Sequence, residues 1–252
     1  MRHVIAVVNQ KGGVGKTTTT INIGAQLAKN GHKVLIIDAD PQGNATSGLG
    51  LNGNVFESTT YNLLVSDTKL DTVIQETYIP NLYIVPANPN LAAAEIELSG
   101  EDKREFKLKD SIKNSLHDFV IIDCPPALGL LSINALVAAD SVIVPVQAEY
   151  YALEGLSQLL NVIQRVKQTL NGKIEILGVV VTMLDRRNSL SNQVHDELKR
   201  HFEDKVFQTV IPRNIRLAEA PSFGKAIFDH DKWSKGARAY KQLAKEVLGR
   251  VS

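Results

Sequence analysis

The stretch Lys11-Gly12-Gly13-Val14-Gly15-Lys16-Thr17 follows an apolar run, Val4–Val8, and precedes a segment with apolar residues at helical spacing. A strand, a glycine-rich loop and a helix in this order are typical of a phosphate-binding loop. Glycine lets backbone N–H groups approach an anion closely, and the helix N-terminus behind the loop adds positive dipole. At this spacing Lys16 can reach terminal phosphates, and the Thr17 hydroxyl can hold Mg²⁺.

One position departs from the usual loop pattern, G-x-x-x-x-G-K-[ST]. The chain has Gln10 where that pattern has glycine, and Lys11 adds a second lysine. Two cations around one loop indicate a phosphate group that takes charge from two directions. The alternative, a glycine-rich turn beside a solvated lysine, is disfavoured by the flanking strand and helix. The residues expected to bind a nucleotide here are Lys11, Gly12, Gly13, Val14, Gly15, Lys16, Thr17 and Thr18.

Apolar strand-like runs alternate with amphipathic segments along the chain. The runs are continuous rather than alternating in polarity, which suits parallel strands covered on both faces. This order predicts an α/β fold, a doubly wound and mostly parallel sheet with helices on both faces and ligands at the C-terminal ends of the strands. We expect a single domain over residues 1–252. The expected strands are Val4–Val8, Val34–Ile37, Leu82–Val85, Phe119–Ile122, Ser141–Pro145, Ile176–Val181 and a weaker one at Val206–Val210.

The composition is that of an ordinary globular protein, with 44% hydrophobic and 22% charged residues. The single Cys124 allows no internal disulfide, and no apolar run has membrane-spanning length, so we expect a protein of the reducing cytoplasm. The net charge of +1 by itself argues against strong nucleic-acid binding. However, residues 185–252 hold 14 Lys and Arg against 9 Asp and Glu, so basic charge is concentrated toward the C-terminal end.

Three other segments have a composition that predicts their structure. Gly43–Gly53 is rich in Gly, Asn and Ser and is interpreted as a mobile loop. Residues 98–115 carry many charges and are interpreted as an exposed helix.

Residues 240–251 carry an apolar stripe opposite Lys and Arg, which predicts a final amphipathic helix. Packing of this helix on the sheet is favoured over membrane binding, because the stripe lacks Phe and Trp.

Acidic residues end two of the expected strands. Asp38 and Asp40 follow the second strand, where a phosphate would bind, so a Mg²⁺ ion or a water is needed to prevent repulsion. Asp38 is interpreted as a structural hydrogen-bond acceptor. Asp123 ends the apolar run Phe119–Ile122, which is the arrangement of a Walker B strand, and is placed to hold the Mg²⁺ shell through water.

These motifs resemble those of the ParA/MinD family of deviant Walker ATPases, and within it the small Soj-like ParA proteins. The resemblance covers Val4 to Leu248 and implies a Mg²⁺-dependent ATPase with the catalytic residues Lys11, Lys16 and Asp40. It implies that Lys11 crosses a nucleotide sandwich dimer to reach the partner's phosphates. It also implies that Asp40 orients or activates the attacking water, and that hydrolysis by the protein alone is slow.

The same resemblance implies a base site and a DNA surface. Met183 and Pro212 would pack on adenine, and Asn214 would hydrogen-bond its edge. Arg187 and Arg216 match positions that bind DNA in Soj-like proteins, the alternative being that both are merely solvated. No helix-turn-helix segment precedes the first strand, so DNA binding without sequence preference is expected.

The implied function is DNA segregation. An ATP-bound homodimer would bind DNA non-specifically and leave it after hydrolysis stimulated by a ParB-type partner, which predicts a protein of the cytoplasm associated with the nucleoid. Two alternatives stay open: a MinD-like ATPase positioned on a membrane surface, and a small-molecule kinase on the same loop architecture. The sequence shows no candidate acceptor pocket for a kinase.

Overall fold

In the described part of the chain, seven strands form one sheet, and six of them run parallel. The computed structural model describes residues 2–52, 56–66, 68–149 and 152–251. The strand order is β3-β4-β2-β5-β1-β6-β7, and β3 pairs antiparallel with β4 at one edge. This order confirms the expected doubly wound sheet. The strands are β1 (His3–Val7), β2 (Val34–Asp38), β3 (Gln75–Glu76), β4 (Leu82–Val85), β5 (Phe119–Asp123), β6 (Ser141–Gln147) and β7 (Glu175–Thr182).

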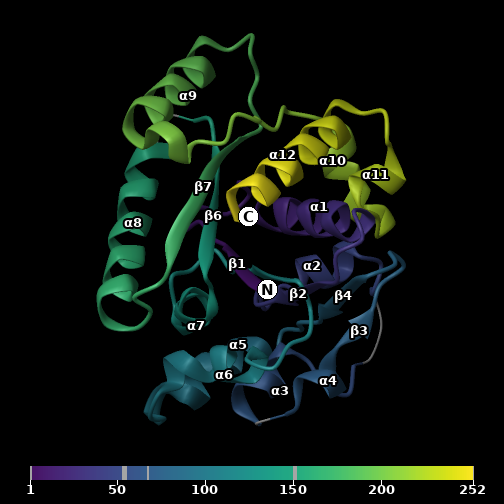
Figure 1. Ribbon diagram of the computed structural model, residues 1–252, viewed down its shortest axis with the longest axis vertical. Coiled ribbons are helices and arrows are strands. Elements are labelled where there is room, and N and C mark those ends of the chain that lie inside the picture. The colour runs from purple at the N-terminus through teal and green to yellow at the C-terminus, as the bar shows by residue number, and fades with distance from the viewer. Residues whose placement is uncertain (1, 53–55, 67, 150–151, 252) are drawn as a thin grey trace.

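Helices cover both faces of the sheet (Figure 1). The α-helices are α1 (Lys16–Lys29), α2 (Asn44–Gly48), α3 (Thr60–Val65), α4 (Leu70–Val73), α5 (Leu91–Glu97), α6 (Lys107–Ile112), α7 (Leu130–Ala138), α8 (Ala152–Thr169), α9 (Ser189–Phe202), α10 (Ile215–Glu219), α11 (Ile227–His230) and α12 (Lys235–Val251). Short 3₁₀ turns are η1 (Leu98–Gly100), η2 (Arg104–Phe106), η3 (Glu203–Lys205) and η4 (Ala220–Phe223). Buried residues of α1, α2 and α10 to α12 share one hydrophobic core, and those of α3 to α9 share the other.

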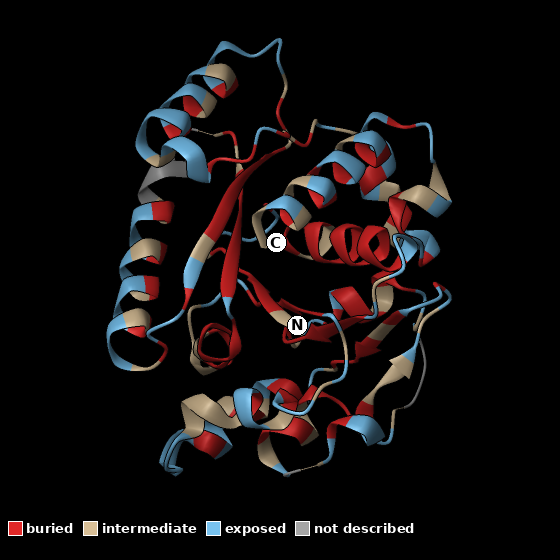
Figure 2. Ribbon diagram, viewed as in Figure 1, coloured by how far each residue is buried: buried red, intermediate tan, exposed pale blue. Residues whose placement is uncertain are grey.

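The central strands supply residues to both cores. In β1, Val4 and Ala6 face the core covered by α3 to α9, whereas Ile5 and Val7 face the core covered by α1 and α12. All four are essentially inaccessible to solvent, and Figure 2 shows the sheet buried between its helix layers. Continuous apolar runs are therefore explained by burial on both faces.

The parallel register brings the C-terminal ends of three strands level with one another. Asp123, the last residue of β5, is the register partner of Val7 in β1 and of Asp38 in β2. Two carboxylates therefore lie side by side on neighbouring strands, next to the loop that follows β1.

The prediction of a weaker strand at Val206–Val210 is wrong. Val206 forms an isolated bridge with Val179 of β7, and no strand follows in this described segment. The N–H groups of Gln208 and Thr209 donate instead to the Glu246 carboxylate of α12, at 2.8 and 2.9 Å. Phe207 N and Ile211 N donate to Val179 O and Val181 O of β7, so the segment touches the sheet edge without forming a continuous ladder with it.

The mobile loop expected at Gly43–Gly53 is also corrected for its described part. Residues 44–48 form α2, in which Ala45 and Thr46 are buried, whereas residue 53 lies outside the described residues. Thr46 is fastened to Asp38 by two hydrogen bonds, from its N and Oγ1, at 2.8 and 2.7 Å. Packing and these bonds outweigh the loop-like composition.

The exposed helix expected over residues 98–115 is broken into three pieces. The turns η1 and η2 precede the six-residue helix α6, and Lys103 between them has a positive φ of 57°. Leu108 and Ile112 of α6 are buried, and α6 contacts α3 and α7, so this segment packs against other helices rather than standing in solvent.

The final helix packs as expected. In α12, Tyr240, Leu243, Ala244 and Val247 are buried in the core that contains α1. The apolar stripe is thus already covered by the protein. Among the described residues, no helix combines the length and the apolarity that crossing a bilayer requires.

Candidate functional site

The loop between β1 and α1 is shaped by glycines. Gly13 and Gly15 have φ values of 73° and 92°, in the left-handed region that side chains rarely adopt. Gly12 is exposed and Val14 is buried, so the loop has one open side. Because α1 begins at Lys16, the N–H groups of its first turn lack partners within the helix. These are the features that favour anion binding.

Two polar side chains tie the loop to neighbouring strands. Asn9 donates from Nδ2 to the Pro145 carbonyl of β6 at 2.7 Å, and its Oδ1 accepts from Lys11 N at 3.0 Å. Thr182, the last residue of β7, donates from Oγ1 to the Val14 carbonyl at 2.8 Å. The loop is therefore held in place before any ligand binds.

The two lysines of the loop point in different directions. Lys16 is buried, and its Nζ donates to the Lys11 carbonyl at 3.1 Å, inside the loop. Burial lowers the pKa of Lys16, and the neighbouring Asp123 and Asp40 oppose this shift. Lys11 is half-exposed, and its Nζ lies 2.5 Å from Glu149 Oε2, directed away from the loop interior.

Asp123 is wholly buried beneath the loop. Its Oδ2 accepts from Thr17 Oγ1 at 2.7 Å and its Oδ1 accepts from Thr20 Oγ1 at 3.1 Å. Burial raises the pKa of Asp123, and the charge of Asp38 raises it further. A buried carboxylate beside a hydroxyl is a donor set of hard oxygens, which Mg²⁺ prefers. Thr17 and Asp123 therefore fit the metal site that the sequence predicts.

The two acids after β2 differ in their surroundings. Asp38 Oδ1 accepts from Asp40 N at 3.2 Å, while its Oδ2 is bonded to Thr46. The interpretation of Asp38 as a structural acceptor is thereby confirmed. Asp40 Oδ1 accepts from Gln42 N at 3.0 Å, and the carboxylate lies close enough to Lys16 to act on its pKa.

A cavity of about 410 Å³ opens beside the loop, where the sequence predicts the adenine base. Its walls include Gly15, Thr18, Met183, Pro212, Asn214 and Tyr240. The segments that carry Met183 and Pro212 run side by side, because Leu184 bridges Pro212 and its N donates to Ile211 O at 3.1 Å. Met183 has a positive φ of 51°, which is uncommon for a residue with a side chain.

Both predicted DNA-binding arginines are paired with acids. Arg187 is 90% exposed and donates to both carboxylate oxygens of Asp185, at 3.0 and 2.9 Å. These hydrogen bonds lower the pKa of Asp185 to about 2. Arg216 donates from Nη1 to Glu219 Oε2 at 2.8 Å, and its Nε lies 3.6 Å from Asp231 Oδ2. Neither guanidinium is simply solvated.

Four residues of this site are absent from the sequence-based predictions. Thr20, one turn after Thr17, could have been found from helical spacing. Asn9 and Glu149 follow the ends of β1 and β6, where side chains reach the ligand edge of the sheet. Tyr240 of α12 lines the base cavity and shares a 3.1 Å hydrogen bond with Thr19 Oγ1, and nothing local in the sequence indicates this.

A left-handed glycine loop at the start of a helix, an acid at the end of the neighbouring strand and a base-sized cavity beside them define a P-loop nucleotide-binding protein. The AAA domain family matches residues 2–176. A crystal structure of cobyrinic acid a,c-diamide synthase from Mycobacterium smegmatis with bound ADP and magnesium superposes with a TM-score of 0.86. Its identity is 37%, over 98% of this chain and 94% of that one.

Two relatives match along nearly their whole length. The sporulation initiation inhibitor protein Soj of Bacillus subtilis is 55% identical over 250 residues, 98% of each chain. The chromosome partitioning protein ParA of Caulobacter vibrioides is 49% identical over 252 residues, 98% of this chain and 94% of that protein. The chain therefore belongs to the ParA/MinD family of P-loop ATPases that the sequence motifs predict, among the Soj and ParA proteins.

Proposed function

We propose that this protein is a Mg²⁺-dependent ATPase that partitions DNA, and that residues 1–252 act as one ATPase domain. The observation that carries the proposal is the 2.7 Å contact of Thr17 with Asp123 beneath the glycine loop. It occurs in a chain that is 55% identical to Soj along nearly its full length. The chemistry of the site and the identity of the chain's relatives therefore both support a partitioning ATPase.

Each predicted site residue has a distinct task in this proposal. Lys16 binds the terminal phosphates, and Asp40 orients the attacking water. Thr17 and Asp123 hold Mg²⁺, which when bound supplies positive charge at the phosphates. Adenine occupies the cavity beside the loop, between Met183, Pro212 and Asn214, and the residues Lys11 to Thr18 surround the phosphates.

The second lysine supports a dimer that forms around ATP. The Lys16 ammonium lies inside the loop, where it donates to the Lys11 carbonyl, whereas the half-exposed Lys11 ammonium points outward. A cation on the open side of the loop can reach the phosphates of a second subunit once it leaves Glu149, with which it is paired. Lys11 would then add charge as the dimer forms, and hydrolysis would proceed within the dimer.

DNA binding and release complete the proposed cycle. Arg187 and Arg216 would contact phosphates, and a dimer would double these contacts on one surface. Phosphate contacts carry no sequence information, so the DNA would be bound non-specifically. A ParB-type partner would stimulate hydrolysis and thereby release the protein, which would work in the cytoplasm on the nucleoid.

The buried tail disfavours the MinD-like alternative. Membrane binding by an amphipathic helix requires an exposed apolar face. The face of α12 that contains Tyr240, Leu243 and Val247 is covered by α1 and its neighbours. A membrane surface would have to displace this packing.

The test is binding of a labelled DNA duplex, followed by fluorescence anisotropy with ATP, with ADP and without nucleotide. We expect DNA binding with ATP that is independent of sequence, and weak binding in the other two states. Hydrolysis of ATP is measured in parallel. If DNA binding is absent with ATP, or equal in all three states, the proposal is overturned, and sedimentation with anionic liposomes would then support the membrane alternative.

A further inference from the structure

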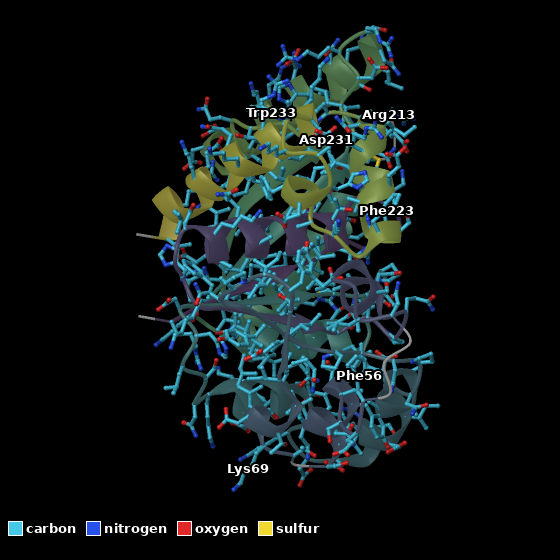
Figure 3. All side chains as sticks on the ribbon, turned by 90° about the vertical axis from the view of Figure 1, so that its right-hand side faces the viewer. Phe56, Lys69, Arg213, Phe223, Asp231 and Trp233 are labelled. Carbon is cyan, nitrogen blue, oxygen red and sulfur yellow. The ribbon has the colours of Figure 1, made fainter. Side chains whose placement is uncertain are left out.

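Trp233 is the chain's only tryptophan, and it is 79% exposed in the turn between α11 and α12. Single exposed apolar side chains are common on protein surfaces, so what Trp233 contacts depends on the groups around it. Figure 3 labels Trp233, Asp231 and Arg213 in the upper half of the molecule, away from Lys69 near its bottom.

One carboxylate links Trp233 to Arg216. Asp231 accepts from Trp233 N through Oδ1 at 3.1 Å, and its Oδ2 lies 3.6 Å from Arg216 Nε. A close helix contact fixes the same arrangement. A Cβ added to Gly236, at the start of α12, would lie 2.6 Å from Leu217 Cγ of α10, so these two helices touch beside Trp233. The indole and the guanidinium therefore belong to one surface.

The charge of this surface favours an anionic partner. Lys232 and Lys235, which flank Trp233 in the sequence, are exposed, as is Arg213, and Lys232 Nζ lies 5.2 Å from the centre of the Trp233 ring. Two acids of this region, Glu219 and Asp231, are both paired with Arg216. Cations are thus in excess where the aromatic ring is exposed, which is the arrangement a polyanion binds.

Duplex DNA fits this surface better than a membrane does. Membrane-surface binding needs a continuous apolar helix face. Trp233 instead stands in a turn, between the exposed Lys232 and the buried Ser234. A ring beside cations has the chemistry to meet a DNA strand, in which an apolar sugar lies between charged phosphates.

We propose that Trp233, Lys232 and Lys235 extend the DNA surface of Arg216, with the indole packed against deoxyribose while the lysines bind flanking phosphates. This inference rests on the proposed DNA binding and names the residues that complete it. A ring on a sugar releases no counterions, so its contribution to affinity is independent of salt. Each lysine contact instead steepens the salt dependence.

The first experiment uses Trp233 as its own probe. Unlabelled duplex DNA is titrated into the full chain with ATP, and the tryptophan fluorescence is recorded beside the anisotropy of labelled DNA. We expect a saturable fluorescence change that follows the anisotropy curve. If labelled DNA binds but the fluorescence does not change, the inference is overturned while the proposed function stands. If labelled DNA does not bind at all, both are overturned.

The second experiment separates the ring from the charges. Trp233→Ala should weaken DNA binding by about fivefold to tenfold, the scale of one aromatic contact, with an unchanged log–log salt slope. Lys232→Ala or Lys235→Ala should instead reduce the slope by about 0.9 per lost contact. The matched control is Leu116→Ala, which removes a 90% exposed apolar side chain between α6 and β5 and should not affect DNA binding.

Three outcomes would refute the assignment. DNA affinity could be unchanged in Trp233→Ala, or it could fall equally in Leu116→Ala. A shift of the tryptophan emission with anionic phosphatidylglycerol vesicles, but not with DNA, would assign Trp233 to a membrane surface instead.

Discussion

Lys11 Nζ lies 2.5 Å from Glu149 Oε2, and Gln147 Nε2 donates to the other oxygen of the same carboxylate. The lysine proposed to reach a second subunit is thus held by an acid of its own subunit. Since this pair is partly exposed, it is worth about 0.2–1 kcal/mol. Glu149 therefore competes only mildly with the phosphates of a partner subunit.

Glu149→Gln should strengthen ATP-dependent dimerisation by about twofold to fivefold, because it removes the charge that holds Lys11 within the subunit. The measurement is the dimer dissociation constant from light scattering with ATP. The matched control is the same change in a Lys11→Ala background, where no lysine remains to be released and no effect is expected. Equal effects in both backgrounds would show that Glu149 does not act through Lys11.

Lys16→Ala should weaken ATP binding by at least about a hundredfold, because it removes the cation inside the phosphate loop. Calorimetry with ATP and Mg²⁺ measures the affinity. Lys69→Ala, which changes a lysine near the bottom of the molecule in Figure 3, should bind ATP normally. Near-normal affinity in Lys16→Ala would contradict the proposed phosphate site.

Asp40→Ala should separate nucleotide binding from hydrolysis. The change removes the carboxylate proposed to orient water but leaves the loop and base cavity intact, so turnover should fall by about a hundredfold or more while an ATP dimer accumulates. Size-exclusion chromatography and phosphate release follow the two effects. Asp110→Ala, an exposed acid of α6, is the control. An Asp40→Ala protein that hydrolyses ATP at the normal rate, or stays monomeric, is incompatible with this role.

Arg187→Glu and Arg216→Glu should each weaken DNA binding while ATP binding and dimerisation persist. Each lost phosphate contact should lower the log–log salt slope by about 0.9. Anisotropy at several salt concentrations measures both quantities. Arg165→Glu, on the exposed side of α8, makes the same charge change away from the proposed surface and should have little effect. Unchanged affinity at about 0.1 M salt would remove the tested arginine from the DNA surface.

Glu246→Ala should destabilise the fold by about 1–3 kcal/mol, because the N–H groups of Gln208 and Thr209 lose their acceptor. Urea unfolding followed by circular dichroism measures the shift in midpoint and slope. Glu175→Ala changes an exposed acid at the edge of β7 and should stay within about 0.5 kcal/mol. Similar losses in both variants would mean that the Glu246 hydrogen bonds add nothing.

The sheet and the glycine loop were predictable because their signals are local. Apolar runs such as Val34–Ile37 are buried on both faces, and the loop takes its shape from Gly13 and Gly15. The segment Val206–Val210 has the same apolar character, yet it forms no strand. Two of its N–H groups donate to Glu246, which is distant in the sequence, and no local pattern reports those hydrogen bonds.

The candidate site likewise contains residues that local patterns predicted and residues that they did not. Lys16, Thr17 and Asp123 each belong to a recognisable motif at a strand end, so they were predictable although Thr17 and Asp123 lie 106 positions apart. The ion pair of Lys11 with Glu149 and the hydrogen bond of Thr19 with Tyr240 also join distant residues, but no motif marks Glu149 or Tyr240. Such contacts follow from tertiary packing and leave no periodic trace in the sequence.

The position of Tyr240 sets the order in which the site can be assembled during synthesis. The phosphate loop emerges from the ribosome with the first helix, but the wall of the base cavity that Tyr240 supplies lies in residues 235–251. These residues emerge after every other part of the site. A nascent chain therefore carries its glycine loop long before the cavity beside that loop has all of its walls.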